Sequence, residues 1–166
     1  MPVFLPAVIS YAAYRRMTDT DRWFGCFRWL YDRHRKYIAL HFRNAYTPRS
    51  PFEDSDRLFR SLRRVIRDID TENLPVTTVG CDSWLDALSS FQQLFPASFA
   101  RSLEETPGEV KTGNGWWGQF VTHRGTLNAR RAEILRKKLR FELPRMHGEC
   151  PFLEFKKHVD RALANS

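Results

Sequence analysis

The sequence has few cysteines and no long apolar run. Its three cysteines are far apart, none belongs to a CxxC pair, and no histidine stands near them at the spacing of a zinc site. We therefore expect neither a disulfide framework nor a metal site, and reduced thiols are typical of a cytoplasmic protein. The apolar segment at the N-terminus contains Pro6 and has no basic region before it, unlike a signal peptide. No run reaches the roughly 18 apolar residues of a membrane span, so we expect no such span.

Acidic residues are scarce relative to basic ones. The chain has 27 lysines and arginines against 19 acidic residues, a formal net charge of +8. This surplus favours an anionic partner, such as nucleic acid, an acidic membrane surface or a phosphorylated small molecule. Residues 124–145 carry the most one-sided charge, with eight basic and two acidic side chains. As the alternative to the small-molecule site described below, the segment predicts a nucleic-acid-binding module that uses Arg130, Arg131, Arg136, Lys137, Lys138 and Arg140.

The composition is that of a globular protein. Hydrophobic residues make up 42% and aromatic residues 14% of the 166 positions, enough for a sizeable core. We expect a single domain over residues 1–166 with a helical segment near its N-terminus. A helix is predicted over 18–36, because Trp23, Phe27 and Leu30 recur at helical spacing. Its aromatic face either packs in the core or forms the interface of a non-catalytic interaction domain.

Strand and helix patterns alternate along the rest of the chain. The predicted strands cover 37–42, 76–80 and 116–122, and the predicted helices cover 55–70, 84–95, 128–141 and 151–163. The first two of these strands are joined through a helix, so they should lie parallel. We predict an α/β fold, a small two-layer or three-layer domain with a mostly parallel sheet of at least three strands and amphipathic helices.

The junction at residues 76–88 is the most informative stretch. Its β-branched run ends at Gly80, and a helical pattern begins at Ser83. Ser83 stands three residues before Asp86, as in a capping box, so we predict that Ser83 caps the helix. Cys81 has two readings. A thiol at a helix N-terminus is reactive when its pKa is lowered, whereas most free cysteines fill space in a core.

The polar residues after the predicted strands indicate a small-molecule site. His41 lies near the carboxyl end of strand 37–42, His123 and Arg124 follow strand 116–122, and Trp117 projects from that strand. Ligands of open α/β sheets bind beyond the carboxyl ends of the strands. His41 or His123 would act as general base, Cys81 as nucleophile, and Arg124 would bind an acidic group. The other predicted ligand contacts are Asp82, Ser83 and Trp84.

A loop over residues 44–54 is predicted from Pro48 and Pro51, because the residue before each proline avoids helical geometry. It would cover this site as a flap. The sequence identifies no cofactor, and it leaves the substrate and the oligomeric state open.

Two short motifs resemble a known family. LHF at 40–42 and CDSWL at 81–85, with Ser61 and Leu62 between them, resemble a domain at the C-terminal side of some bacterial GNAT-like acyltransferases. The resemblance covers residues 40–94, about a third of the chain. It implies a bacterial protein with an α/β fold and a link to acyl-group chemistry, with a small acidic or acyl ligand. The glycine-containing loop that binds the acyl-CoA pyrophosphate in GNAT enzymes is not evident.

Overall fold

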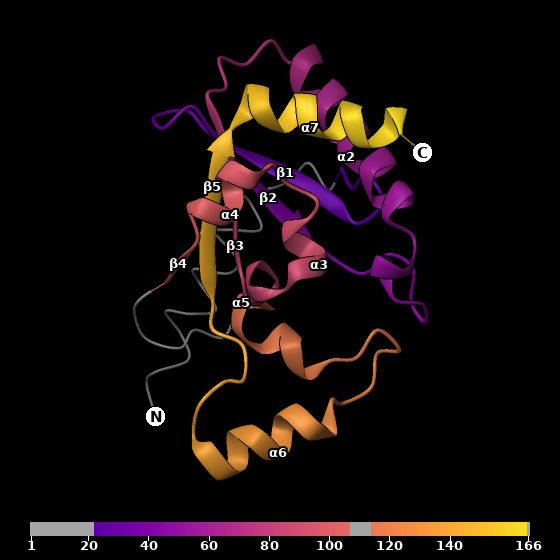
Figure 1. The fold of residues 1–166 in the computed structure, drawn as a ribbon, viewed down its shortest axis with the longest axis vertical. Coiled ribbons are helices and arrows are strands. Elements are labelled where there is room, and N and C mark those ends of the chain that lie inside the picture. Colours follow the sequence, from indigo (N-terminus) through magenta and orange to yellow (C-terminus); the bar gives the residue numbers. More distant parts are fainter. Residues whose placement is uncertain (1–21, 107–113, 166) are drawn as a thin grey trace.

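The computed structural model describes residues 22–106 and 114–165 of the chain. Within these residues, five strands form one mixed sheet in the order β1-β2-β3-β5-β4 (Figure 1). The strands are β1 (Phe27–Asp32), β2 (Tyr37–Phe42), β3 (Thr78–Ser83), β4 (Glu104–Glu105) and β5 (Met146–Pro151). The α/β class and the strand predicted at 37–42 are therefore confirmed.

The sheet is mostly antiparallel, so the prediction of a mostly parallel sheet is wrong. Among the described strands only β2 and β3 run parallel, as the helix between them predicts. β1 forms a hairpin with β2, and β5 runs antiparallel to both β3 and β4. The sequence pattern missed β5 because His147, Gly148 and Glu149 have little strand preference. Pairing with two neighbours, rather than composition, makes this segment a strand.

Residues 22–36 contain no helix, contrary to the helix predicted over 18–36, of which residues 18–21 lie outside the described part. β1 turns into β2 at residues 33–36, where the Asp32 carboxylate accepts hydrogen bonds from the N–H groups of His34 and Arg35. Gly25, at φ 61°, interrupts any helix before that. The aromatic spacing fits a helix, yet pairing with β2 satisfies the backbone. The aromatic helical interface predicted for this segment does not exist in its described residues.

Four helices pack on one face of the sheet (Figure 1). They are α2 (Ser55–Thr71), α3 (Ser89–Gln92), α4 (Ala97–Arg101) and α7 (Phe152–Ala164). Their apolar side chains form one core with alternate strand residues, which include Ile38, Leu40, Val79, Cys81 and Cys150. The helices predicted at 55–70 and 151–163 are confirmed, whereas the one predicted at 84–95 is split by the extended residue Leu88 into η2 (Trp84–Ala87) and α3. No helix among the described residues combines the length and apolar composition needed to cross a bilayer.

Residues 114–143 form a smaller unit below the sheet, the α6 lobe (Figure 1). It contains α5 (Asn114–Trp117), η3 (Gly118–Phe120) and α6 (Ala129–Lys138), so the strand predicted at 116–122 is wrong and the helix predicted at 128–141 is confirmed over most of its length. Trp116, Trp117 and Phe120 each pack against Phe141. Side chains three and four positions apart meet on a helical turn but not on a strand, which explains the helical geometry.

Gln119 ties the α6 lobe together from inside. Its side chain is fully buried, donates hydrogen bonds to the carbonyls of Trp116 and Leu143, and accepts one from the N–H of Leu143. A buried amide with all of these partners fixes the lobe's return to β5.

Candidate functional site

The junction after β3 is a capped, buried turn. Ser83 accepts a hydrogen bond from the N–H of Leu85, and its own N–H donates to a carboxyl oxygen of Asp86 at 3.0 Å. The predicted capping box is confirmed. The strand does not end at Gly80 as predicted, because residues 80–83 continue to pair with β5. The strand therefore runs directly into the capped turn at Ser83.

Cys81 lies inside this junction, only 4% exposed and on the face that the helices cover. Burial raises the pKa of the Cys81 thiol well above its usual value, and the neighbouring Asp86 carboxyl raises it further. Burial also raises the pKa of Asp86 to about 8. Both groups keep their protons at neutral pH. A neutral buried thiol is a poor nucleophile, so this geometry favours the space-filling reading of Cys81.

His41 lies on the opposite face of the sheet from Cys81. Ala39 pairs with Gly80 in the parallel register, so Leu40 shares the face of Cys81 and His41 points the other way. Burial lowers the pKa of His41 to about 4, with a further contribution from the Arg28 charge opposite it in β1. The imidazole is neutral at physiological pH. The sheet itself separates the predicted base from the predicted nucleophile.

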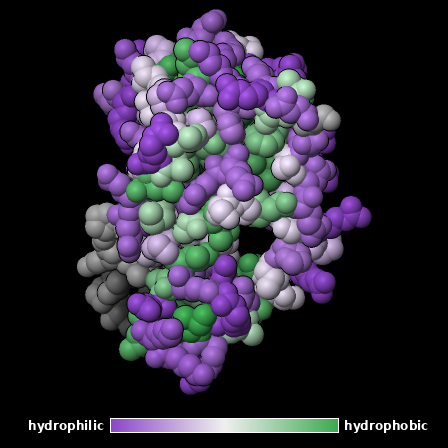
Figure 2. All heavy atoms as spheres, viewed as in Figure 1, coloured by the Kyte–Doolittle hydropathy of each residue, from purple (hydrophilic) through white to green (hydrophobic). Residues whose placement is uncertain are grey.

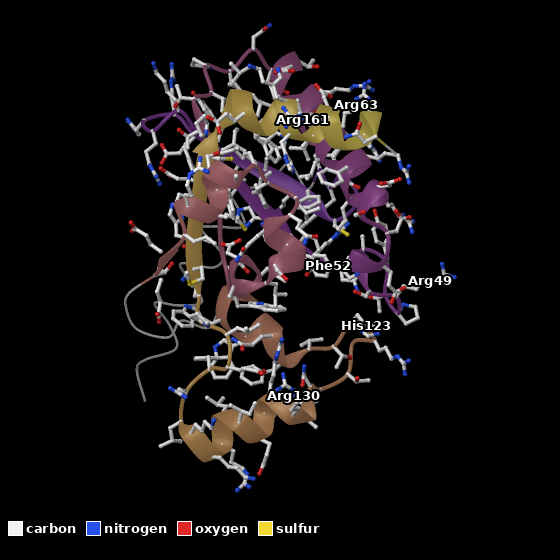
Figure 3. All side chains as sticks on the ribbon, in the orientation of Figure 1. Arg49, Phe52, Arg63, His123, Arg130 and Arg161 are labelled. Carbon is white, nitrogen blue, oxygen red and sulfur yellow. The ribbon has the colours of Figure 1, made fainter. Side chains whose placement is uncertain are left out.

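His123 and Arg124 lie in an exposed turn of the α6 lobe. Thr122 and Thr126 close this turn through backbone and side-chain hydrogen bonds. The Asn44 side-chain amide bridges it to the neighbouring loop by donating to the carbonyls of His123 and Arg49. Figure 3 shows the side chains of His123 and Arg49 on facing segments. The contact brings loop 44–54 to the α6 lobe.

The predicted ligand contacts near β3 instead hold elements together. Asp82 forms a two-point ion pair with Arg145, at 2.6 and 2.5 Å, and accepts a hydrogen bond from Thr106. The Trp84 ring lies under the Arg131 guanidinium, with 5.3 Å between the guanidinium carbon and the ring centroid. These contacts join β3 to the segment that leads into β5, and η2 to the α6 lobe.

The eight predicted site residues therefore occupy three places. Cys81, Ser83 and Trp84 belong to the buried junction, His41 and Asp82 to the other face of the sheet, and Trp117, His123 and Arg124 to the α6 lobe. They do not converge on one pocket. Among residues 22–106 and 114–165, no group of three or more His, Cys, Asp and Glu side chains is arranged to hold a metal ion.

The strongest surface feature is the outer side of the α6 lobe, which we call the α6 surface. It is made by Arg124, Arg130, Arg136, Lys137, Lys138 and Arg140, all of which are exposed. No residue of α6 is buried. Four of the large exposed apolar side chains of the described chain lie in the same lobe, among them Leu139 at 88% and Trp117 at 42% exposure. Figure 2 shows hydrophilic and hydrophobic residues side by side over this end of the molecule.

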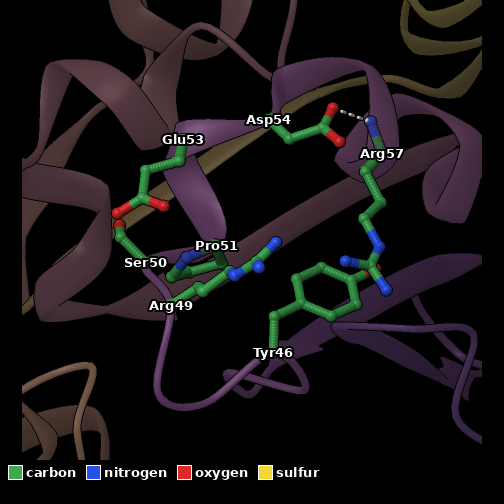
Figure 4. A pocket seen from close by; sticks show the side chains of 7 residues that line it. All are labelled: Tyr46, Arg49, Ser50, Pro51, Glu53, Asp54 and Arg57. Atoms are coloured by element: carbon green, nitrogen blue, oxygen red, sulfur yellow. Dashed lines mark hydrogen bonds between the residues drawn. The ribbon is translucent and has the colours of Figure 1, made fainter.

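Sequence reasoning missed a hollow beside loop 44–54 (Figure 4). Its volume is about 260 Å³, and it is lined by Tyr46, Arg49, Ser50, Pro51, Glu53, Asp54 and Arg57. The predicted loop is thus present apart from a short 3-10 helix, η1 (Pro51–Glu53), and it borders this hollow rather than covering the predicted residues. The signal in the sequence was the pair of arginines on either side of the loop's second proline, which the helical charge pattern of α2 obscured.

Comparison with protein families, with curated proteins and with solved structures finds no match to this chain. The resemblance of residues 40–94 to the GNAT-associated domain stays a prediction.

Proposed function

We propose that the protein binds nucleic acid through the α6 surface. The observation that carries the proposal is the imbalance of charge there, where each carboxylate is shared by two cations. Glu142 pairs with Arg130 and Arg131, and Glu133 pairs with Arg136 and Lys137. Each group keeps a net positive charge. Arg124, Lys138 and Arg140 have no carboxylate partner among the described residues.

Two basic residues of segment 124–145, Arg131 and Arg145, are engaged in contacts within the protein. The Arg131 side chain is only 16% exposed, donates to the Gln119 carbonyl and the Glu142 carboxylate, and covers Trp84. Arg145 is engaged with Asp82. Both residues stabilise the fold, so a ligand would bind to the six exposed cations of the α6 surface.

Phosphate is the anion that suits this surface. Four of its six cations are arginines, whose planar guanidinium groups bind phosphate oxygens in pairs. Trp117 adds an exposed aromatic ring that packs against Phe141, which follows Arg140 in the chain, and exposed aromatic rings can stack on the bases of a single strand. Basic and aromatic groups together favour a single-stranded nucleic acid over a simple anion.

A small-molecule site at the carboxyl edge of the sheet, with chemistry related to acyl transfer, is the alternative. It requires Cys81 as the nucleophile and either His41 or His123 as the general base to act on one ligand. The sheet separates His41 from Cys81, and His123 lies in an exposed turn of the α6 lobe, so this alternative has less support.

The proposal is tested by fluorescence anisotropy with a labelled single-stranded oligonucleotide and its duplex over a series of salt concentrations. Affinity should fall steeply with salt. Replacing Lys137, Lys138 and Arg140 with glutamine should weaken binding at least about tenfold and lower the slope of log K against log salt by about 2 to 3.

A matched control removes the same charge elsewhere. Arg60, Arg63 and Arg67 are exposed on α2, and their replacement with glutamine should leave affinity within about twofold, since α2 lies away from the proposed surface. Equal losses in both triple variants would show a general charge effect and contradict a site on α6. Binding to anionic vesicles without binding to either oligonucleotide would exclude nucleic acid as the partner.

A further inference from the structure

The hollow beside loop 44–54 has opposite charges at its two ends. Figure 4 shows the Glu53 carboxylate at one end, the Arg57 guanidinium at the other, and the Arg49 side chain crossing between them. We propose that this hollow binds a small zwitterion of the amino-acid type, with its carboxylate on the two guanidinium groups and its ammonium group at Glu53. This site is separate from the α6 surface and does not depend on the proposed nucleic-acid binding.

The two arginines are available to a ligand. Neither Arg49 nor Arg57 forms an ion pair with a carboxylate among the described residues. The Arg57 guanidinium is nevertheless held in place, because its carbon lies 3.6 Å from the centre of the Tyr46 ring, while the backbone N–H of Arg57 donates to the Asp54 carboxylate at the helix start. A cation that is already positioned loses little freedom when it binds an anion. Arg49 lines the same small hollow, and two guanidinium groups there suit a carboxylate.

The two acidic residues that line the hollow, Asp54 and Glu53, differ in whether they have an ion-pair partner. Asp54 caps α2 through the N–H of Arg57 at 2.9 Å and lies 4.0 Å from Arg60. Glu53 has no ion-pair partner among the described residues. An ordinary phosphate would be repelled by this carboxylate, whereas a ligand that carries an ammonium group next to its carboxylate satisfies both ends.

The walls set the size of the ligand. The volume of about 260 Å³ admits a small metabolite and not a polymer. Pro51 and the Tyr46 ring supply apolar contact between the charged ends. Tyr46 is itself supported from behind, since its hydroxyl lies 3.4 Å from the Ser61 hydroxyl of α2. Contacts with α2 therefore help to fix the wall of the hollow, which the loop does not form alone.

Isothermal titration of the purified chain with the common amino acids tests the proposal. At least one should bind saturably at up to roughly 10 mM, about ten times the dissociation constant of a weak 1 mM site. Arg49→Gln should weaken this binding by about tenfold or more, and Glu53→Gln should do the same, because each removes a charged hydrogen bond. Arg67→Gln, which changes an exposed arginine of α2 that neither lines the hollow nor pairs with a lining residue, is the control and should bind as the unchanged protein does.

Ligand analogues distinguish the two ends. The N-acetyl derivative of the bound amino acid should lose affinity for the unchanged protein but not for Glu53→Gln, whose partner charge is already gone. The amide derivative should likewise be insensitive to Arg49→Gln. Inorganic phosphate that binds as well as any amino acid would overturn the zwitterion and leave a simple anion site. Absence of saturable binding by every amino acid, or binding unaffected in both variants, would overturn the site altogether.

Discussion

The junction after β3 and the α6 surface use polar residues in opposite ways. At the junction, Ser83 and Asp86 cap each other, Asp82 is locked to Arg145, and the Cys81 thiol is buried. On α6, four cations share two carboxylates, and no side chain of the helix is buried. Polar residues at a strand end can thus serve the fold alone, whereas a shortage of carboxylates leaves basic side chains of the α6 lobe exposed and without an ion-pair partner among the described residues.

The largest expected difference in stability is between a buried core ring and an exposed side chain of the α6 lobe. Phe91 is fully buried and packs against Phe42, Phe52 and Phe95. Phe91→Ala should lower the free energy of unfolding by about 3–5 kcal/mol. Leu139→Ala, at an exposed position beside α6, should change it by less than about 0.5 kcal/mol. Urea unfolding measures both, and a large loss in Leu139→Ala would show that the lobe depends on this side chain.

The buried Asp86 carboxyl should make stability depend on pH. Its pKa is about 8 in the folded protein against 3.8 ordinarily, so below pH 4 both the folded and the unfolded states hold the proton. Between pH 4 and 8 the unfolded state ionises first, and the free energy of unfolding should fall by up to about 1.4 kcal/mol per pH unit. Above pH 8 the effect should level off.

Asp86→Asn tests this pH dependence, because the amide oxygen can still accept the hydrogen bond from Ser83. The variant should match the unchanged protein near pH 4 and be increasingly more stable as pH rises to 8. Thermal or urea unfolding across this range provides the measurement. Parallel curves for the two proteins would mean that Asp86 ionises normally in the folded state.

Loss of the α6 helix cap should have a small effect on the free energy of unfolding. It also tests whether the α6 lobe opens separately from the sheet. Asn128 caps α6 by accepting a hydrogen bond from the N–H of Arg131. Asn128→Ala should cost about 1 kcal/mol. Since α6 buries no residue, we expect faster amide hydrogen exchange in α6 with little change in β3 or α2. Ser83→Ala should instead accelerate exchange across the sheet, and identical exchange patterns for the two cap variants would contradict a separately opening lobe.

Short-range sequence patterns predicted some elements correctly and others wrongly. The apolar stripe of α2, the alternation in β2 and the Ser83 cap were all predicted correctly, because each depends on neighbours within about four residues. Trp23, Phe27 and Leu30 fit a helix equally well, but the segment pairs with β2. Trp116, Trp117 and Phe120 fit a strand but meet on helical turns around Phe141.

The candidate site was predictable only in part. The basic character of residues 124–145 could be read from the sequence, since charge needs no partner to be counted. The roles of Arg131 and Arg145 could not, because their partners Gln119, Glu142 and Asp82 come from other elements. The hollow could not be predicted either, because its lining residues come from two elements, with Tyr46 in loop 44–54 and Arg57 in the first turn of α2.

The sequence by itself determined the α/β class, the amphipathic helices, the cap at Ser83 and the positive charge near the C-terminal half. These properties follow from short-range periodicity, capping chemistry and composition. Only the tertiary structure decided the antiparallel sheet, the face on which each of His41 and Cys81 lies, and the cations that remain unpaired. Strand neighbours and ion pairs join residues far apart in the chain, and their choice depends on the packing of the whole molecule rather than on any one stretch.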